Sequence, residues 1–225
     1  MKKVFPATTL ALCATIFVAG CAYRGGDIGD PAVRKFSWFS FVGGNDIRAQ
    51  CEPGLPDRVR LVYNAIYDEQ VRIYEWDGLR KLVSIKVIGS GNALALTSDD
   101  LLGPWRATAE KVQLDDKTYD LLASALQADG AFGPPAVGLE LPSRGYYWSA
   151  ATCRGGRFTM TGWRHPSEAF DRLQAPGVLF ALDPTGIAVR PAAPVPYDVI
   201  WEDKRKRGQA VDFTLKIGSN GLVGQ

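Results

Sequence analysis

Few residues of this chain carry side chains that could do chemistry. The sequence contains four cysteines and one histidine. A thiol can act as a nucleophile, pair in a disulfide or ligate a metal. Cys13 lies inside an N-terminal apolar run, Cys21 closes that run, and Cys51 and Cys153 lie in the body of the chain. The segment around each cysteine therefore decides which chemistry is open to it.

Residues 1–20 have the layout of a secretory signal. Lys2 and Lys3 precede an apolar run from Val4 to Ala19, the order of charged and apolar regions that such signals share. The run is short and rich in threonine, whereas a helix across about 30 Å of hydrocarbon takes about 20 predominantly apolar residues. We therefore expect export, and a retained membrane-spanning anchor is the weaker interpretation.

The end of this segment, Val18-Ala19-Gly20-Cys21, resembles the lipobox of bacterial lipoproteins. The resemblance covers only the targeting segment, and it implies a diglyceride in thioether linkage on Cys21, cleavage before that cysteine and acylation of the new amine. Two or three acyl chains hold a domain at a bilayer, whereas one binds reversibly. The alternative is an ordinary signal peptide, with Cys21 free or in a disulfide.

The resemblance also implies a destination. Ala22 follows the cysteine where an inner-membrane retention signal would have aspartate, so the family pattern implies the outer membrane, facing the periplasm. Residues 21–34, with several glycines, are expected to form the lipidated cysteine and a flexible tether. Residues 35–225 are expected to form one globular domain.

Cys51 and Cys153 remain in the exported chain, in an oxidising compartment. Two remaining thiols predict one disulfide between them, which would close a long loop. The alternative is two buried free thiols.

The charge of the exported chain is balanced. Removal of Lys2 and Lys3 leaves 24 basic residues (26 minus 2) against 24 acidic ones. Nucleic-acid binding normally relies on a positive field that attracts phosphates. Charge and compartment both argue against a nucleic-acid partner, and nothing in the sequence predicts an oligomeric state.

Alternating apolar residues predict an antiparallel-rich α+β fold with one main helix and one or two short helices. The helices are expected after Asp115 or Asp116, ending at Gly130, and after Pro166, closing at Pro176, with an irregular proline-rich crossing after the second. The expected strands are 36–41, 58–65, 71–76, 82–88, 105–114, 146–153, 157–163 and 211–217.

An aromatic cluster lies on the hairpin predicted at 146–163, and such rings could stack on a sugar or a peptide. Alternatively, these rings are buried in the core, as alternating aromatic residues of a strand commonly are. The candidate ligand surface consists of Tyr146, Tyr147, Trp148, Trp163, Arg144 and Arg164.

One strong basic run, Lys204, Arg205, Lys206 and Arg207, lies before the last predicted strand. It is interpreted as a solvated hairpin tip, and the alternative is contact with anionic headgroups or lipopolysaccharide phosphates.

Catalytic patterns are few. The chain has no G-x-S-x-G or S-x-x-K pattern. His165 lacks spaced partners for a metal site, and the acid pairs at 68–69, 99–100, 115–116 and 202–203 are explained as caps or surface charges. No catalytic residue, metal or cofactor is therefore predicted. We expect a membrane-anchored envelope lipoprotein that binds a protein, glycan or lipid, and the alternative is a periplasmic hydrolase of envelope material.

Overall fold

The computed structural model describes residues 23–90 and 101–224. Its helices are α1 (Pro31–Val42), α2 (Asn45–Ala49), the one-turn η2 (Gly103–Trp105), α3 (Asp116–Ala128), α4 (Glu168–Asp171), α5 (Ala175–Leu182) and α6 (Val199–Lys206). Its strands are β1 (Arg58–Ala65), β2 (Gln70–Asp77), β3 (Leu82–Gly89), β4 (Thr108–Gln113), β5 (Glu140–Pro142), β6 (Tyr146–Arg154), β7 (Arg157–Arg164), β8 (Thr214–Gly218) and β9 (Gly221–Leu222).

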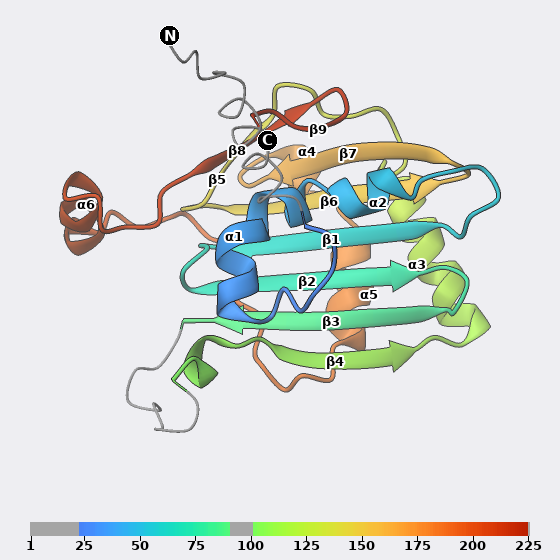
Figure 1. Cartoon of the computed structure of the whole chain (residues 1–225), viewed down its shortest axis with the longest axis horizontal. Coiled ribbons are helices and arrows are strands. Elements are labelled where there is room, and N and C mark those ends of the chain that lie inside the picture. The colour runs from blue at the N-terminus through green and yellow to red at the C-terminus, as the bar shows by residue number, and fades with distance from the viewer. Residues whose placement is uncertain (1–22, 91–100, 225) are drawn as a thin grey trace, which may run out of the picture.

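The main sheet is six-stranded and antiparallel, in the order β4-β3-β2-β1-β6-β7 (Figure 1). β1 lies inside the sheet, where Val62 is opposite Ile73 of β2 and Ser149 of β6. A second, three-stranded sheet joins β5, β8 and β9. The predicted antiparallel-rich α+β fold is confirmed, including the β1–β2 and β6–β7 hairpins.

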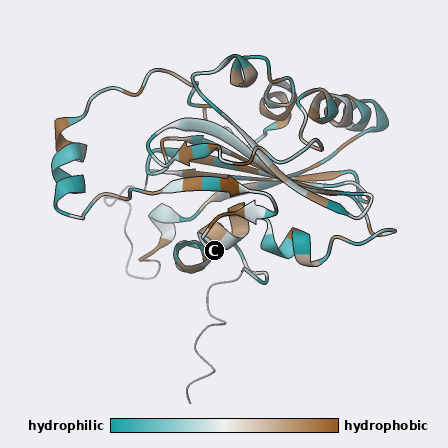
Figure 2. Ribbon diagram, turned by 90° about the horizontal axis from the view of Figure 1, so that it is seen from above, coloured by the Kyte–Doolittle hydropathy of each residue, from teal (hydrophilic) through white to brown (hydrophobic). Residues whose placement is uncertain are grey.

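Both faces of the main sheet are covered, and Figure 2 shows helices on either side of it. On one face, Leu61 and Tyr63 belong to a core that contains Leu122 of α3 and Leu179 of α5. On the other face, Val62 belongs to a core formed with α1 and the small sheet. Every residue from Val59 to Ala65 is buried as a result.

Helix α1 replaces the strand predicted at 36–41, so that prediction is wrong. The carboxylate of Asp30 accepts hydrogen bonds from the amides of Ala32 (2.8 Å) and Val33 (3.2 Å). Pro31 occupies the first turn, where its missing N–H costs nothing. Closely spaced aromatic residues fit both a strand and a helix, and the Asp30-Pro31 cap decides between them.

The folded part also begins before residue 35, where the domain was predicted to start. Ile28 is fully buried. The amide of Tyr23 donates to Ser40 Oγ at 2.8 Å, and its ring meets that of Phe41 edge-on at 4.9 Å. Tyr23 and Ile28 therefore pack on the domain, residues 31–34 belong to α1, and only residues 24–27 between them are exposed, so this part of the chain is not a free tether.

The main helix follows its sequence signals. Asp115 caps α3 by accepting a 2.7 Å hydrogen bond from the amide of Thr118. Gly130 follows the helix with a φ of +75°, a left-handed conformation that favours glycine. A short helix, α4, also follows Pro166 as predicted, but Pro176 lies in the first turn of α5 and does not close α4.

An arginine is buried on the α1 face of the sheet. Arg60 is 1% exposed. Its guanidinium donates two 2.8 Å hydrogen bonds to the carboxylate of Asp46 and one of 2.8 Å to Glu75 Oε1, and it lies 3.7 Å from the ring centroid of Phe41. Burial alone lowers the pKa of Arg60, but the contacts with the two carboxylates outweigh burial and raise it. Arg60 therefore stays charged.

A second arginine is buried on the α5 face. Arg72 is fully buried and forms an ion pair with Asp183, at the end of α5, whose side chain is 3% exposed. Arg72 also donates to the carbonyl of Ile187, and the Tyr74 hydroxyl donates to Asp183 at 3.1 Å. The ion pair fixes the beginning of the chain segment that crosses this face.

The rest of that segment is held by polar side chains of the sheet. Gln70 donates to the carbonyl of Ala188 and accepts from the amide of Arg190, both at 2.9 Å. The Tyr63 hydroxyl donates to the carbonyl of Arg190 at 2.8 Å. Residues 183–190, which we call the clasped segment, are therefore fixed although they form no helix or strand.

The predicted disulfide is confirmed. Cys51 and Cys153 are bonded across 102 residues of sequence. The bond ties the loop after α2 to the end of β6, and closing so long a loop contributes about 4 to 5 kcal/mol in the chain-entropy model.

The clasped segment gives a first prediction. Asp183→Ala leaves Arg72 buried without its carboxylate, and loss of one partner of a buried ion pair costs about 3–5 kcal/mol. We expect that loss in the free energy of unfolding at pH 7, measured by urea titration. Glu168→Ala, which removes the exposed Glu168–Arg172 pair, is the matched control and should cost under about 1 kcal/mol.

The loss should depend on pH. Burial raises the pKa of Asp183, but hydrogen bonds from Thr185 and the charge of Arg72 outweigh it and hold the pKa below its usual value. The stabilisation is therefore present at neutral pH and fades as the pH falls below about 4. Equal losses in the two variants at pH 7 would refute the role of this ion pair.

Candidate functional site: the α6 arm and its basic run

The most distinctive surface feature is a projecting arm, residues 191–213, which we call the α6 arm. In Figures 1 and 2 it leaves the body after the clasped segment, carries α6 at its tip and returns to β8. Prolines 191, 194 and 196 lie in its first limb, where they limit the chain to extended conformations. The arm therefore presents α6 away from the sheet.

The sequence of the tip favours a helix. Asp198 accepts hydrogen bonds from the amides of Ile200 (2.9 Å) and Trp201 (3.0 Å), which lower its pKa. Lys204, Arg205 and Lys206 occupy the last turn, where cations interact favourably with the helix dipole. The basic run was predicted as a hairpin tip, and this is corrected: it ends a helix, and Arg207 is its C-cap.

Arg144 fixes α6 to the body through three contacts. The guanidinium of Arg144, on the loop between β5 and β6, lies 4.5 Å from the ring centroid of Trp201. Arg144 also donates to the carbonyl of Pro196 at 3.2 Å and lies 3.7 Å from Asp198. Trp201, which also lies 5.9 Å from the guanidinium of Arg205, is 9% exposed, so α6 has an inner side held by Arg144 and an outer side open to solvent.

The outer side begins with apolar residues. Tyr197, Val199 and Ile200 are 81%, 67% and 69% exposed. Sequence reasoning missed them, although an apolar group between Pro196 and a basic run was a usable signal. Exposed apolar side chains next to one another mark an interaction site more often than isolated ones do.

The basic run is partly neutralised within the helix. Arg205 pairs with Glu202 at 2.9 Å, and Arg207 pairs with Asp203 at 2.6 Å. No ion pair of Lys204 or Lys206 with a described residue is found. The tip of the arm thus combines an apolar start with two lysines for which no ion pair with a described residue is found.

The candidate aromatic ligand surface is contradicted, and the alternative, burial of these rings in the core, is what the structure shows. Tyr146, Tyr147, Trp148 and Trp163 are 3%, 0%, 2% and 9% exposed. The reason is that β6 is flanked by β1 and β7 and covered on both faces, so both sets of its alternating side chains are buried. Of the two arginines assigned to that surface, Arg144 holds α6 and Arg164 is exposed at the end of β7.

An open hollow of about 500 Å³ lies beside Trp163 and contains Asp129 and Arg172 in its lining. The two oxygens of Asp129 accept 2.8 Å hydrogen bonds from the amides of Gln174 and Ala175, at the start of α5. Its carboxylate therefore already has a structural role. The hollow offers no free acid pair.

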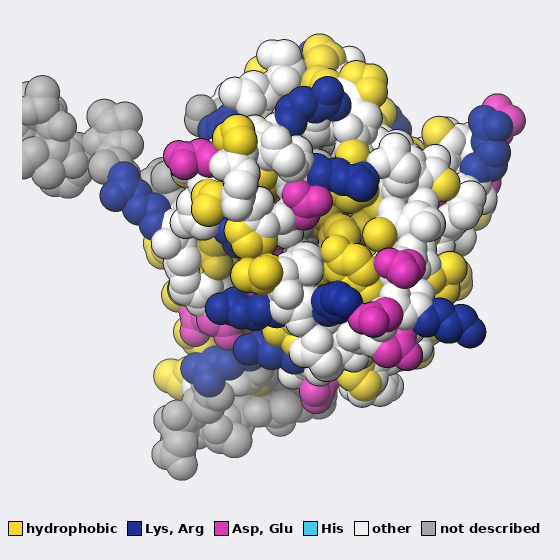
Figure 3. All heavy atoms as spheres, turned by 90° about the vertical axis from the view of Figure 1, so that its right-hand side faces the viewer, with side chains coloured by type: hydrophobic (Ala, Val, Ile, Leu, Met, Phe, Trp, Pro, Cys, Tyr) yellow, Lys and Arg dark blue, Asp and Glu magenta, His cyan; other side chains and the backbone are white. Residues whose placement is uncertain are grey.

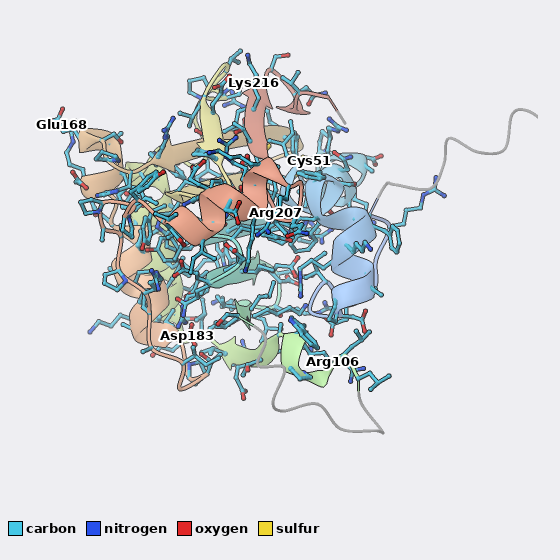
Figure 4. The ribbon with its side chains drawn as sticks, turned by 90° about the vertical axis from the view of Figure 1, so that its left-hand side faces the viewer. Cys51, Arg106, Glu168, Asp183, Arg207 and Lys216 are labelled. Carbon is cyan, nitrogen blue, oxygen red and sulfur yellow. A yellow bond between two sulfur atoms is a disulfide. The ribbon has the colours of Figure 1, made fainter. Side chains whose placement is uncertain are left out.

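The described residues bring no catalytic set together. The ring of His165 packs edge-on against those of Tyr146 and Phe170. In the described part of the chain, no group of three or more His, Cys, Asp or Glu side chains could hold a metal. Figure 4 shows Glu168 and Asp183 well apart from each other and from Arg207.

The acid pairs have structural partners. Glu69 pairs with Arg190, and Asp116 pairs with Lys81, whereas 99–100 lie outside the described residues. Figure 3 shows acidic and basic side chains interspersed around an apolar hollow at the end of the molecule opposite α6. The surface at that end therefore has no electrostatic potential of a single sign.

Cys21 lies outside the described residues, so its predicted lipidation remains a prediction. In the ranges 23–90 and 101–224, no helix is long and apolar enough to cross a membrane.

Comparisons with known protein families, with curated proteins and with solved structures found no match.

The hold of Arg144 on the arm can be tested by proteolysis. Arg144→Ala removes the stack on Trp201 and should increase the rate of tryptic cleavage within the basic run at least several-fold, because α6 then opens more often. Cleavage is followed by mass spectrometry. Arg154→Ala, at the far end of β6, is the control and should leave that rate unchanged; an unchanged rate in Arg144→Ala would contradict the hold.

Proposed function

We propose that this chain is a lipoprotein of a bacterial cell envelope, anchored by lipid on Cys21, and that its domain is a binding or structural module. Val18-Ala19-Gly20-Cys21 supports the anchor. The disulfide between Cys51 and Cys153 suits the oxidising compartment that such export implies. Ala22 favours the outer membrane, facing the periplasm.

The α6 arm is the observation that carries the proposal of a binding module. The arm carries α6 outward, the Arg144–Trp201 stack fixes the inner side of this helix, and Tyr197, Val199 and Ile200 are left exposed. These side chains do not contribute to the core, so their exposure is better explained by a partner than by stability. We propose that the arm contacts an envelope protein, glycan or lipid.

A hydrolase of envelope material has less support. Glycoside hydrolysis needs two carboxylates facing each other across a cleft. Among the described residues, Asp129 in the lining of the hollow beside Trp163 accepts hydrogen bonds from the start of α5, and Glu168, one residue before Ala169 of that lining, pairs with Arg172.

Metabolic labelling tests the anchor. The full chain is expressed in a bacterium with a palmitate analogue, as wild type and as Cys21→Ala, and the membranes are then separated. We expect label and membrane retention in the wild type and loss of both in the variant. Cys51→Ala with Cys153→Ala is the control for loss of a cysteine and should keep the label.

An unlabelled, freely diffusing wild-type protein would contradict the proposed anchor.

A further inference from the structure

We propose that the outer side of α1 rests on the anionic phospholipid surface of the membrane that holds the anchor. This inference rests on the proposed function, because it needs the domain to be tethered nearby. The outer side of α1 is defined by Ala32, Lys35, Phe36 and Phe39, all exposed.

Helix α1 has two different apolar sides. Trp38, Phe41 and Val42 are buried in the core. Phe36 and Phe39, three residues apart and therefore on one side of a helix, are 69% and 47% exposed. The core does not explain why this helix carries two more phenylalanines on the side turned to solvent.

The apolar surface continues beyond α1. The ring of Phe39 meets that of Phe213 edge-on, with centroids 5.1 Å apart. Val211, two residues before Phe213, is 49% exposed. The outer side of α1 and the returning limb of the α6 arm therefore form one apolar surface.

The charges of α1 suit an anionic partner, and Asp212, which is exposed beside Phe213, interacts electrostatically with Arg205. Helix α1 contains no acidic residue, and Lys35 lies 5.9 Å from the ring centroid of Phe36. A lysine beside an inserted aromatic ring can keep its ammonium among the headgroups. At the start of the helix, Asp30 is occupied by its capping hydrogen bonds. A bilayer with anionic lipids attracts such a surface.

The position of the anchor adds a geometric argument. Tyr23 contacts Ser40 and Phe41 of α1, so the chain joins the fold beside this helix. Cys21 is two residues upstream, and two residues span at most about 7 Å. Lipid on Cys21 would therefore hold α1 close to the bilayer, and a phospholipid surface is the occupant that the observations favour.

Vesicle binding tests the inference without the lipid on Cys21. The chain from Ala22 to Gln225 contains every described contact, and its cosedimentation is measured with vesicles of equal parts phosphatidylglycerol and phosphatidylcholine, and with phosphatidylcholine alone. We expect binding to the anionic vesicles only, reduced about tenfold or more in Phe36→Ser with Phe39→Ser. Lys35→Glu should reduce it about fivefold.

The control is Leu79→Ser with Leu55→Ser. These leucines are 74% and 46% exposed, close to the values for Phe36 and Phe39, and should leave binding unchanged. Equal loss in both double variants, or no binding of the wild type to anionic vesicles, would overturn the inference. The inference would also be overturned if the wild type were a dimer that dissociated only in the Phe36→Ser with Phe39→Ser variant. In that case a second copy of the chain would cover α1. Palmitate labelling of Cys21 is measured in a separate experiment. Failure of the proposed anchor can therefore be distinguished from failure of this inference.

Discussion

The structure depends on one constraint: the central strands carry arginines and yet are buried on both faces. Arg60 and Arg72 point to opposite faces of the sheet, and an unpaired buried charge would cost several kcal/mol. The elements that cover each face must therefore supply carboxylates as well as apolar side chains. Asp46 comes from α2 on one face, and Asp183 comes from the end of α5 on the other.

This constraint also shapes the two surfaces to which we assign function. The ion pair of Arg72 and the hydrogen bonds of Gln70 fix residues 183–190 on the sheet, so the proline-containing limb that follows starts from a defined point and carries α6 outward. On the other face, α1 covers the sheet with one side and leaves Phe36 and Phe39 on its other side exposed. The elements that cover the two faces of the sheet therefore also position both surfaces.

Much of the fold could be predicted from the sequence because local signals decide it. Alternation in β1, β2 and β3, the Asp115 cap and the Arg154-Gly155-Gly156 turn are all local. The second covered face could not be predicted in this way, because Arg60 and Arg72 alternate with apolar residues as they would on a solvated face. Their partners lie 14 and 111 residues away in sequence. The same covered face buries Tyr147, which was a candidate for the ligand surface.

The candidate site was predicted only in part. The basic run was found because four cations in a row are visible in any sequence, but its place on a projecting helix depends on Arg144, far away in sequence. The exposed side of α1 was missed because Phe36 to Phe41 was interpreted as a strand. Tertiary contacts, rather than local propensity, decide which aromatic residues remain at the surface.

The most direct test of the proposed anchor is the mass of the N-terminal peptide of the mature protein, purified from membranes of an expressing bacterium and digested with a protease. The proposal predicts a peptide that begins at Cys21 and carries a diglyceride and a further acyl chain. A peptide that begins at another residue, or an unmodified Cys21, would contradict it.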